Sequence, residues 1–123
     1  MRVEHCKIEP AHSDERRTIT AMFNGDFDAK QVKILRITQG NVLGNHYHHY
    51  REMFYLLEGE AIYEFIDLDS NERATIHLEK GGRIVIEPRV AHRAQFMKDT
   101  VMVEATEKPY VSAAENDVRF VEW

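Results

Sequence analysis

Two histidines and a glutamate stand at fixed spacings inside the stretch GNVLGNHYHHYREMFYLLEG, which runs from Gly40 to Gly59. His46 and His48 are two residues apart, and Glu52 follows four residues later. Since side chains alternate faces along a β-strand, all three can project from one face if the strand runs straight. Two imidazoles and a carboxylate that converge are ligands for a divalent transition metal. A buried glutamate needs such a partner, because an unpaired charge is costly to bury.

A fourth ligand of this kind comes from the stretch GGRIVIEPRVAH, which ends at His92. The spacing of the first stretch resembles the first motif of the cupin superfamily at every defined position, and His92 stands where the second cupin motif places its histidine. The second motif departs from the family pattern elsewhere. Glu87 replaces the usual proline and Arg89 replaces the usual glycine. The resemblance covers roughly residues 32–106, which is most of the chain.

This resemblance implies an all-β fold, a single cupin barrel of the jelly-roll or double-stranded β-helix type, with residues 1–123 forming one domain. It also implies one bound metal ion, held by His46, His48, Glu52 and His92. The ion is a divalent transition metal such as Zn, Fe, Mn or Ni. Four protein ligands leave one or two positions open on a five- or six-coordinate ion, and open positions are typical of catalytic sites.

The composition excludes several classes of protein. The 123 residues suffice for one domain, and a net charge of −5 argues against a nucleic-acid partner. The chain has no apolar run of the ~20 residues that a membrane helix needs. The N-terminal residues lack the apolar core of a signal peptide. A single cysteine, Cys6, excludes an internal disulfide. We therefore expect a cytoplasmic protein.

Short alternating segments predict strands throughout the centre of the chain, including Val32–Thr38, Arg83–Glu87 and Thr100–Thr106. Their spacing is that of an all-β barrel and leaves no room for helices between parallel strands. The tail after Glu107 loses this alternation, and Ser112–Asn116 is long enough for one helical turn.

Gly59 predicts a tight hairpin between the strand that begins at Glu52 and the strand that follows Glu60. In this hairpin, Phe54 and Tyr63 face the same interior as Glu52. The outer face of the two strands would then carry five apolar side chains, which are Met53, Tyr55, Leu57, Ile62 and Ile66. An exposed patch of this kind marks an interface, so we expect a homodimer unless the N-terminal segment or the C-terminal tail covers it.

The stretch HYHHYREMFYLLEGEA is similar to cupins associated with polysaccharide and sugar-nucleotide synthesis. That resemblance implies an isomerase or epimerase acting on an activated sugar, in which the metal polarises an oxygen at the reacting centre. Glu52 and Tyr63 are then the catalytic candidates, with Tyr63 or a residue of the second motif moving the proton. Two alternatives stay open, an iron-dependent dioxygenase and a non-catalytic module that binds a small ligand.

Arginines cluster in sequence around both motifs, and a basic mouth favours a carboxylate or phosphate substrate. We therefore expect an anionic, carbohydrate-derived small molecule as the partner. The candidates for contact with it are Arg89 and Arg93, together with the interior aromatics Phe54 and Tyr63.

Overall fold

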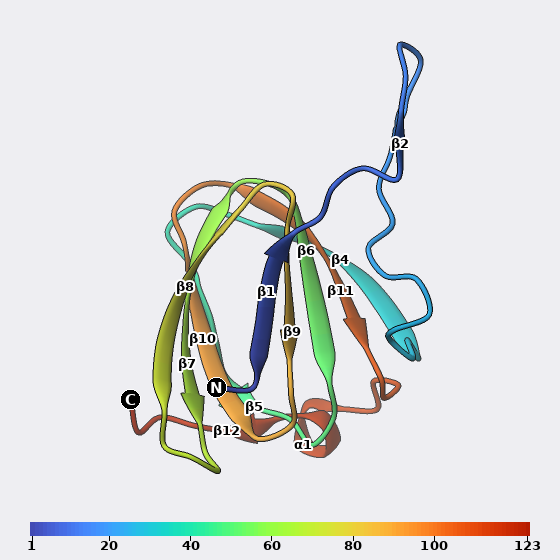
Figure 1. Cartoon of the computed structure of the whole chain (residues 1–123). Coiled ribbons are helices and arrows are strands. Elements are labelled where there is room, and N and C mark those ends of the chain that lie inside the picture. Colours follow the sequence, from blue (N-terminus) through green and yellow to red (C-terminus); the bar gives the residue numbers. More distant parts are fainter.

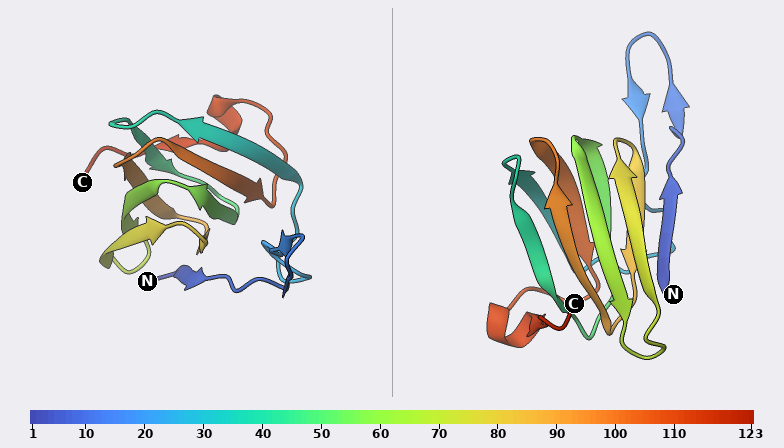
Figure 2. Two further views of the ribbon diagram at one scale, coloured as in Figure 1. Left: turned by 90° about the horizontal axis from the view of Figure 1, so that it is seen from above. Right: turned by 90° about the vertical axis from the view of Figure 1, so that its left-hand side faces the viewer.

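The computed structural model describes residues 1–123 and consists of two five-stranded antiparallel sheets that face each other (Figures 1 and 2). In order across the first sheet, the strands are β1 (Val3–Lys7), β9 (Gly82–Ile86), β6 (Glu52–Glu58), β11 (Thr100–Thr106) and β4 (Gln31–Ile37). The second sheet contains β12 (Val118–Arg119), β5 (Val42–Tyr47), β10 (Val90–Phe96), β7 (Glu60–Asp67) and β8 (Arg73–Glu79). The predicted all-β jelly-roll barrel is confirmed.

Three small elements lie outside the two sheets. The strands β2 (His12–Ser13) and β3 (Thr18–Ile19) form a hairpin that extends away from the barrel (Figure 1). One short helix, α1 (Ala113–Asn116), follows β11 and is capped by the side chain of Ser112. It matches the single helical turn that the sequence predicts. No helix in the structure combines the length and the apolar character needed to cross a membrane.

Alternating side chains of both sheets fill the space between them. On β6, Phe54 and Leu56 are buried, and on β7, Ala61, Tyr63 and Phe65 are buried. They belong to a core cluster of 13 buried residues. Each large apolar side chain of this kind stabilises the fold by ~1.5–3 kcal/mol. The sequence therefore predicted correctly which side chains of these two strands face inward.

The predicted hairpin between β6 and β7 is wrong. β6 pairs with β9 and β11, whereas β7 pairs with β8 and β10 in the other sheet. Gly59 lies where the chain crosses between the sheets, with φ of +103°. A Cβ atom on Gly59 would lie 2.7 Å from the carbonyl oxygen of Asp99, so only glycine fits this corner.

The five apolar residues predicted to form one outer patch are consequently divided between two sheets. Met53 is only 1% exposed, because Phe27 and its neighbours in the N-terminal segment pack against it on the outside of the first sheet. Ile66 is also buried, with 5% of its surface exposed. Leu57 alone is well exposed, at 39%. The surface on which the homodimer was predicted therefore does not exist as one patch.

Candidate metal centre

Three strands and one loop, from both sheets, bring the four candidate ligands together. His46 lies on β5 and pairs directly with His92 on the neighbouring strand β10. His48 follows the end of β5, and Glu52 opens β6 in the opposite sheet. The chain thus turns between His48 and Glu52, and the three residues do not lie on the straight strand that the sequence suggested.

The backbone of β5 is distorted next to His46. Gly44 has φ of +101° and Asn45 has φ of 59°, and the register between β5 and β10 shifts after His92. A Cβ atom on Gly44 would lie 2.7 Å from the carbonyl oxygen of His92. This close approach of the two strands needs a glycine, and it helps to set the imidazoles of His46 and His92 against each other, with ring centroids 4.8 Å apart.

The ligand atoms of the four residues all lie within 4.8 Å of one another. The two oxygens of Glu52 each face one imidazole. Oε2 of Glu52 lies 3.1 Å from Nε2 of His48, and Oε1 lies 2.8 Å from Nε2 of His92. Glu52, His92 and His48 are buried, with at most 6% of each residue exposed.

The hydrogen bonds behind the imidazoles decide which nitrogen faces the centre. Nδ1 of His48 lies 2.8 Å from the carbonyl oxygen of Asn116, and Nδ1 of His92 lies 3.1 Å from that of Val90. Because a carbonyl can only accept, each Nδ1 carries a proton and donates it. Whenever either ring is neutral, its Nε2 lone pair therefore points toward the centre, which is the orientation of histidines that bind a metal.

This arrangement leaves polar atoms without partners. Oε1 of Glu52 and Nε2 of His92 are both buried and have no hydrogen-bond partner, although they lie only 2.8 Å apart. Orphaned buried acceptors of this kind are rare in proteins and call for an explanation. A bound cation held by Glu52 and His92 would supply it. The donor set of three imidazoles and one carboxylate therefore fits a divalent transition metal.

The charges in the centre come from Glu52 and from His48, whose proton on Nε2 a bound cation would displace. Burial, together with the neighbouring histidines, lowers the pKa of His46 to about 3. Burial also lowers the pKa of His48, but the hydrogen bond and the charge of Glu52 outweigh it and raise that pKa to about 9. Burial disfavours the charge of Glu52, but His92 and His48 hold its pKa well below the usual range. The carboxylate is therefore ionised and attracts positive charge.

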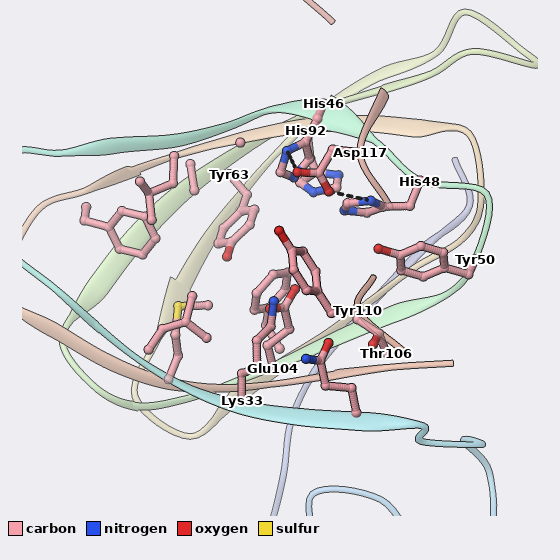
Figure 3. A pocket seen from close by; sticks show the side chains of 18 residues that line it. Lys33, His46, His48, Tyr50, Tyr63, His92, Glu104, Thr106, Tyr110 and Asp117 are labelled. Carbon is pink, nitrogen blue, oxygen red and sulfur yellow. Dashed lines mark ion pairs between the residues drawn. The ribbon is translucent and has the colours of Figure 1, made fainter. Parts of the chain in front are cut away.

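A cavity of about 200 Å³ opens beside the four residues (Figure 3). Its apolar wall includes Phe54, and the phenols of Tyr63 and Tyr110 point into it between the histidines and the pair formed by Lys33 and Glu104. Tyr63 is only 3% exposed. Burial and the charges of Glu52 and Glu104 raise the pKa of Tyr63 well above its usual value, so its phenol remains protonated.

Glu104 is a candidate functional residue that the sequence analysis missed. It lies on β11, is 7% exposed and lines the cavity, with its Oε1 atom 2.9 Å from Nζ of Lys33. Burial and the negative charge of Glu52 raise the pKa of Glu104 to about 8, against the opposing effect of Lys33. The sequence could have identified Glu104 from its position between Met102 and Thr106, because alternation along a strand puts all three side chains on the same, inward face.

The structure does not bring the two predicted arginines into the cavity. Nε of Arg89 lies 2.9 Å from Oδ1 of Asp69, and neither residue lines the cavity. Arg93 forms an ion pair with Glu64 at 3.0 Å and lies over the ring of Trp123, 4.5 Å from its centroid. Lys33 is the one lysine or arginine among the residues that line the cavity.

The comparisons with known proteins agree with the fold. The family model described as a cupin domain matches residues 33–106. The search of curated proteins found no match. Among solved structures, a 3,4-ketoisomerase from Helicobacter canadensis is 15% identical, with a TM-score of 0.82, and the match covers 97% of this chain and 91% of that chain.

Two further structures contain bound sugar nucleotides. A mutant of the 3,4-ketoisomerase QdtA from Thermoanaerobacterium thermosaccharolyticum, in complex with TDP-4-keto-6-deoxyglucose, is 18% identical, with a TM-score of 0.78 and coverage of 95% of this chain and 86% of that chain. The 3,5-epimerase RmlC from Legionella pneumophila, in complex with dTDP-4-keto-L-rhamnose, is 14% identical, with a TM-score of 0.78 and coverage of 95% and 71%. At these identities the likeness establishes the fold alone.

Proposed function

Because the chain belongs to the cupin superfamily, we propose that it is a metal-dependent isomerase or epimerase that acts on a carbohydrate-derived, sugar-nucleotide-like substrate. One observation carries the proposal. His92, whose buried Nε2 atom has no hydrogen-bond partner, lines a cavity together with His46 and His48, and the same cavity is lined by a buried carboxyl group, Glu104, and a buried phenol, Tyr63. A metal-binding cluster and two groups able to carry a proton therefore face the same small space.

The residues of the cluster would hold the ion, and the ion would supply Lewis-acid chemistry toward a carbonyl or enolate oxygen. The proton transfers belong to the protein. Isomerisation next to a carbonyl group needs one group that takes a proton from carbon and one that returns a proton elsewhere. With a pKa of about 8, Glu104 can do either near neutral pH. The raised pKa of Tyr63 keeps its phenol protonated, so Tyr63 can donate a hydrogen bond to an oxygen of the substrate.

The size of the cavity limits what enters it. At about 200 Å³, it is smaller than the ~300–1,000 Å³ typical of sites that enclose drug-sized ligands. We infer that the reacting sugar lies inside and that the remainder of an activated sugar lies at the mouth. Lys33, whose side chain is 42% exposed, lies there with its Nζ atom 5.7 Å from the ring centroid of Tyr110. Lys33 is the positively charged side chain of the cavity that can bind an anionic group of the substrate.

The solved structures add support of a general kind. They are a 3,4-ketoisomerase and a 3,5-epimerase, each in complex with a keto sugar linked to a nucleotide. Both reactions move a proton next to a carbonyl group, which is the chemistry that the cavity of this chain is equipped to perform. We propose the same class of substrate for this protein.

The experiment is an anaerobic incubation of the purified protein with TDP-linked 4-keto sugars in deuterated water, with Zn²⁺, Mn²⁺ or Fe²⁺ added separately. Deuterium incorporation beside the carbonyl, together with an isomerised or epimerised product, is the expected result. Oxygen consumption with Fe²⁺ in air, without anaerobic turnover, would instead identify a dioxygenase. Tight binding without deuterium exchange would identify a binding module.

We also propose that the protein forms a homodimer, through a surface that differs from the predicted one. Val32 and Ile34 are 59% and 70% exposed on the outer face of the edge strand β4. Ile34 lies opposite Val103 on β11, which in turn lies opposite Tyr55 on β6. This row gives the outside of the first sheet an apolar strip that a second copy of the chain can cover around a two-fold axis.

A further inference from the structure

The segment of residues 109–119, which we call the C-terminal clasp, lies directly behind the candidate metal centre. It contains α1 and β12, and β12 pairs with β5 so that Arg119 lies opposite His46 and Val118 opposite Tyr47. Tyr110 and Asp117 of the clasp line the cavity. A four-residue helix has no stability of its own in water, so the clasp depends on its contacts with the barrel.

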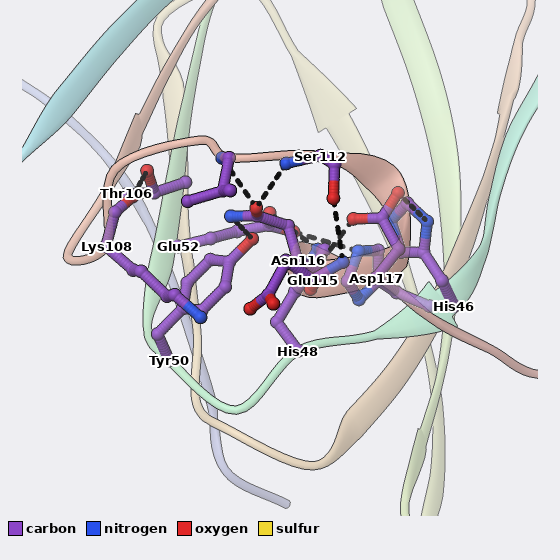
Figure 4. Close-up of polar contacts among 12 residues, drawn as sticks. His46, His48, Tyr50, Glu52, Thr106, Lys108, Ser112, Glu115, Asn116 and Asp117 are labelled. Atoms are coloured by element: carbon purple, nitrogen blue, oxygen red, sulfur yellow. Dashed lines mark hydrogen bonds and ion pairs between the residues drawn. The ribbon is translucent and has the colours of Figure 1, made fainter.

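Asn116 holds the clasp together (Figure 4). It is 4% exposed, and its side-chain oxygen accepts hydrogen bonds from the backbone N–H groups of Val111 (2.8 Å) and Ser112 (3.3 Å). Its side-chain nitrogen donates to the carbonyl oxygen of Pro109 (3.2 Å) and to the hydroxyl of Tyr50 (3.3 Å). One buried amide thus ties both arms of the clasp to each other and to the barrel.

The clasp also contacts two of the candidate ligands, His48 and His46, directly. The backbone carbonyl of Asn116 accepts the hydrogen bond from Nδ1 of His48, which fixes the tautomer that presents Nε2 to the centre. Oδ1 of Asp117 lies 3.4 Å from the same Nδ1, and its other oxygen lies 4.0 Å from Nδ1 of His46. On its other side, the ring of His48 stacks on Tyr50, with centroids 4.8 Å apart, and Tyr50 is the residue that Asn116 bonds.

We propose that the C-terminal clasp positions His48 and His46 for the metal and that the metal in turn orders the clasp. The inference rests on the proposed metal site. Outer hydrogen-bond partners fix the ring orientation of metal-binding histidines and raise their basicity. By linkage, a segment that raises the affinity for the ion must itself be stabilised by the ion to the same degree. Asn116 and Asp117 are therefore positioning residues, and neither is a ligand.

The test is a Co²⁺ titration of the metal-free protein, followed by the visible absorption of the bound ion. Asn116→Ala removes the side-chain hydrogen bonds that hold the clasp together. Asp117→Asn removes the negative charge beside the Nδ1 atoms of His46 and His48. Each variant should bind Co²⁺ about 10–100-fold more weakly than the wild type, the range expected for an outer partner. Glu115→Gln is the matched control, because it removes one negative charge from an exposed position of the same helix. It should bind as the wild type does.

Hydrogen exchange supplies the reciprocal measurement. Addition of Co²⁺ to the wild type should slow the exchange of the amides of Glu115, Asn116 and Asp117, which donate within the helical turn. In Asn116→Ala this protection should be lost, while the melting temperature of the metal-free barrel changes little. A structural role alone would not change the cobalt spectrum or the metal-linked protection.

The outcomes separate two failures. If the wild type binds Co²⁺ and both clasp variants bind it with unchanged affinity, the inference is overturned and the metal site stands. Unchanged exchange of the clasp amides on metal binding overturns it equally. If the wild type binds no metal ion at all, the proposed function falls, and the inference falls with it.

Discussion

Nε2 of His92 and Oε1 of Glu52 lie 2.8 Å apart in a buried centre, and neither atom has a hydrogen-bond partner. Nδ1 of His92 already donates to the carbonyl of Val90, so the neutral ring has no second N–H for the carboxylate. A cation held by these two residues would remove the conflict.

Elemental analysis should find about one transition-metal ion per chain in protein that was never exposed to a nickel column. His92→Ala removes one of the four ligands. Loss of a residue that only hydrogen-bonds a ligand typically weakens metal binding about 10–100-fold, and loss of the ligand itself should weaken it further. His77→Ala is the control, since His77 pairs with Glu60 on the surface, away from the centre. Equal metal content in the two variants would show that the ion binds elsewhere.

Glu104→Gln should abolish most of the isomerase activity while leaving the metal in place. General acid–base groups contribute typically about 10²–10⁴-fold to a rate, and the amide cannot exchange a proton. Steady-state kinetics and metal analysis on the same sample make the comparison. Glu64→Gln, which removes a surface carboxylate paired with Arg93, should keep full activity. Turnover by Glu104→Gln at the wild-type rate would assign the proton transfer to another group.

Asp67 should make the fold sensitive to acid. Its hydrogen bond with Arg2 lowers the pKa of this carboxyl from 3.8 to about 2, so the folded state favours the ionised form. The stabilisation is complete above about pH 4 and is lost as the pH falls through 2. Asp67→Asn should cost about 1–2 kcal/mol at pH 7, a value reduced by the partial exposure of Arg2. Urea unfolding of both proteins at pH 7 and at pH 2 should give a difference in stability that is much smaller at the lower pH.

Arg89 should be replaceable without loss of substrate affinity. The sequence suggested that it binds an anion, but the structure pairs it with Asp69 and gives its backbone φ of 64°. A left-handed conformation costs a non-glycine residue about 1–2 kcal/mol, whereas a surface ion pair contributes about 0–1 kcal/mol. Arg89→Gly should therefore leave stability equal or higher, and Arg89→Ala should lower it slightly. Thermal melting checks the stability, and a KM increased by either variant would restore the arginine to the substrate site.

Light scattering at low micromolar concentration should give twice the chain mass of 14.4 kDa. Ile34→Glu introduces a charge at the most exposed apolar position of the strip and should produce monomers. Leu43→Glu, on β5 of the other sheet, is the matched control for mass. A wild type that is monomeric, or a dimer unaffected by Ile34→Glu, contradicts the proposed interface.

The sequence was informative where local rules apply. The spacing of His46, His48, Glu52 and His92 predicted the cluster, and alternation predicted the inward side chains Phe54 and Tyr63 and the strand Thr100–Thr106. Alternation does not identify which strand lies beside which. That is why β6 and β7, adjacent in sequence, were wrongly paired, and why the apolar patch built on that pairing failed.

The remaining differences depend on contacts between distant residues. Arg89 meets Asp69 from another loop, and nothing in the sequence around either residue shows that pairing. Asp117 reaches the histidines only because β12 joins β5, and the tail has no periodic pattern that would predict this. Glu104 was within reach, because its place in an alternating strand predicts that it faces inward.

The candidate ligands are divided between the two sheets, with His46 and His92 on one and Glu52 on the other. An ion bound by all of them would fasten the two halves of the barrel together at its open end, as a cross-link does. Separating the sheets would then require breaking coordinate bonds, so the ion should act on the rate of unfolding as well as on its equilibrium. The metal-bound barrel would then unfold slowly. The rate of metal exchange would measure the rate at which the two sheets separate.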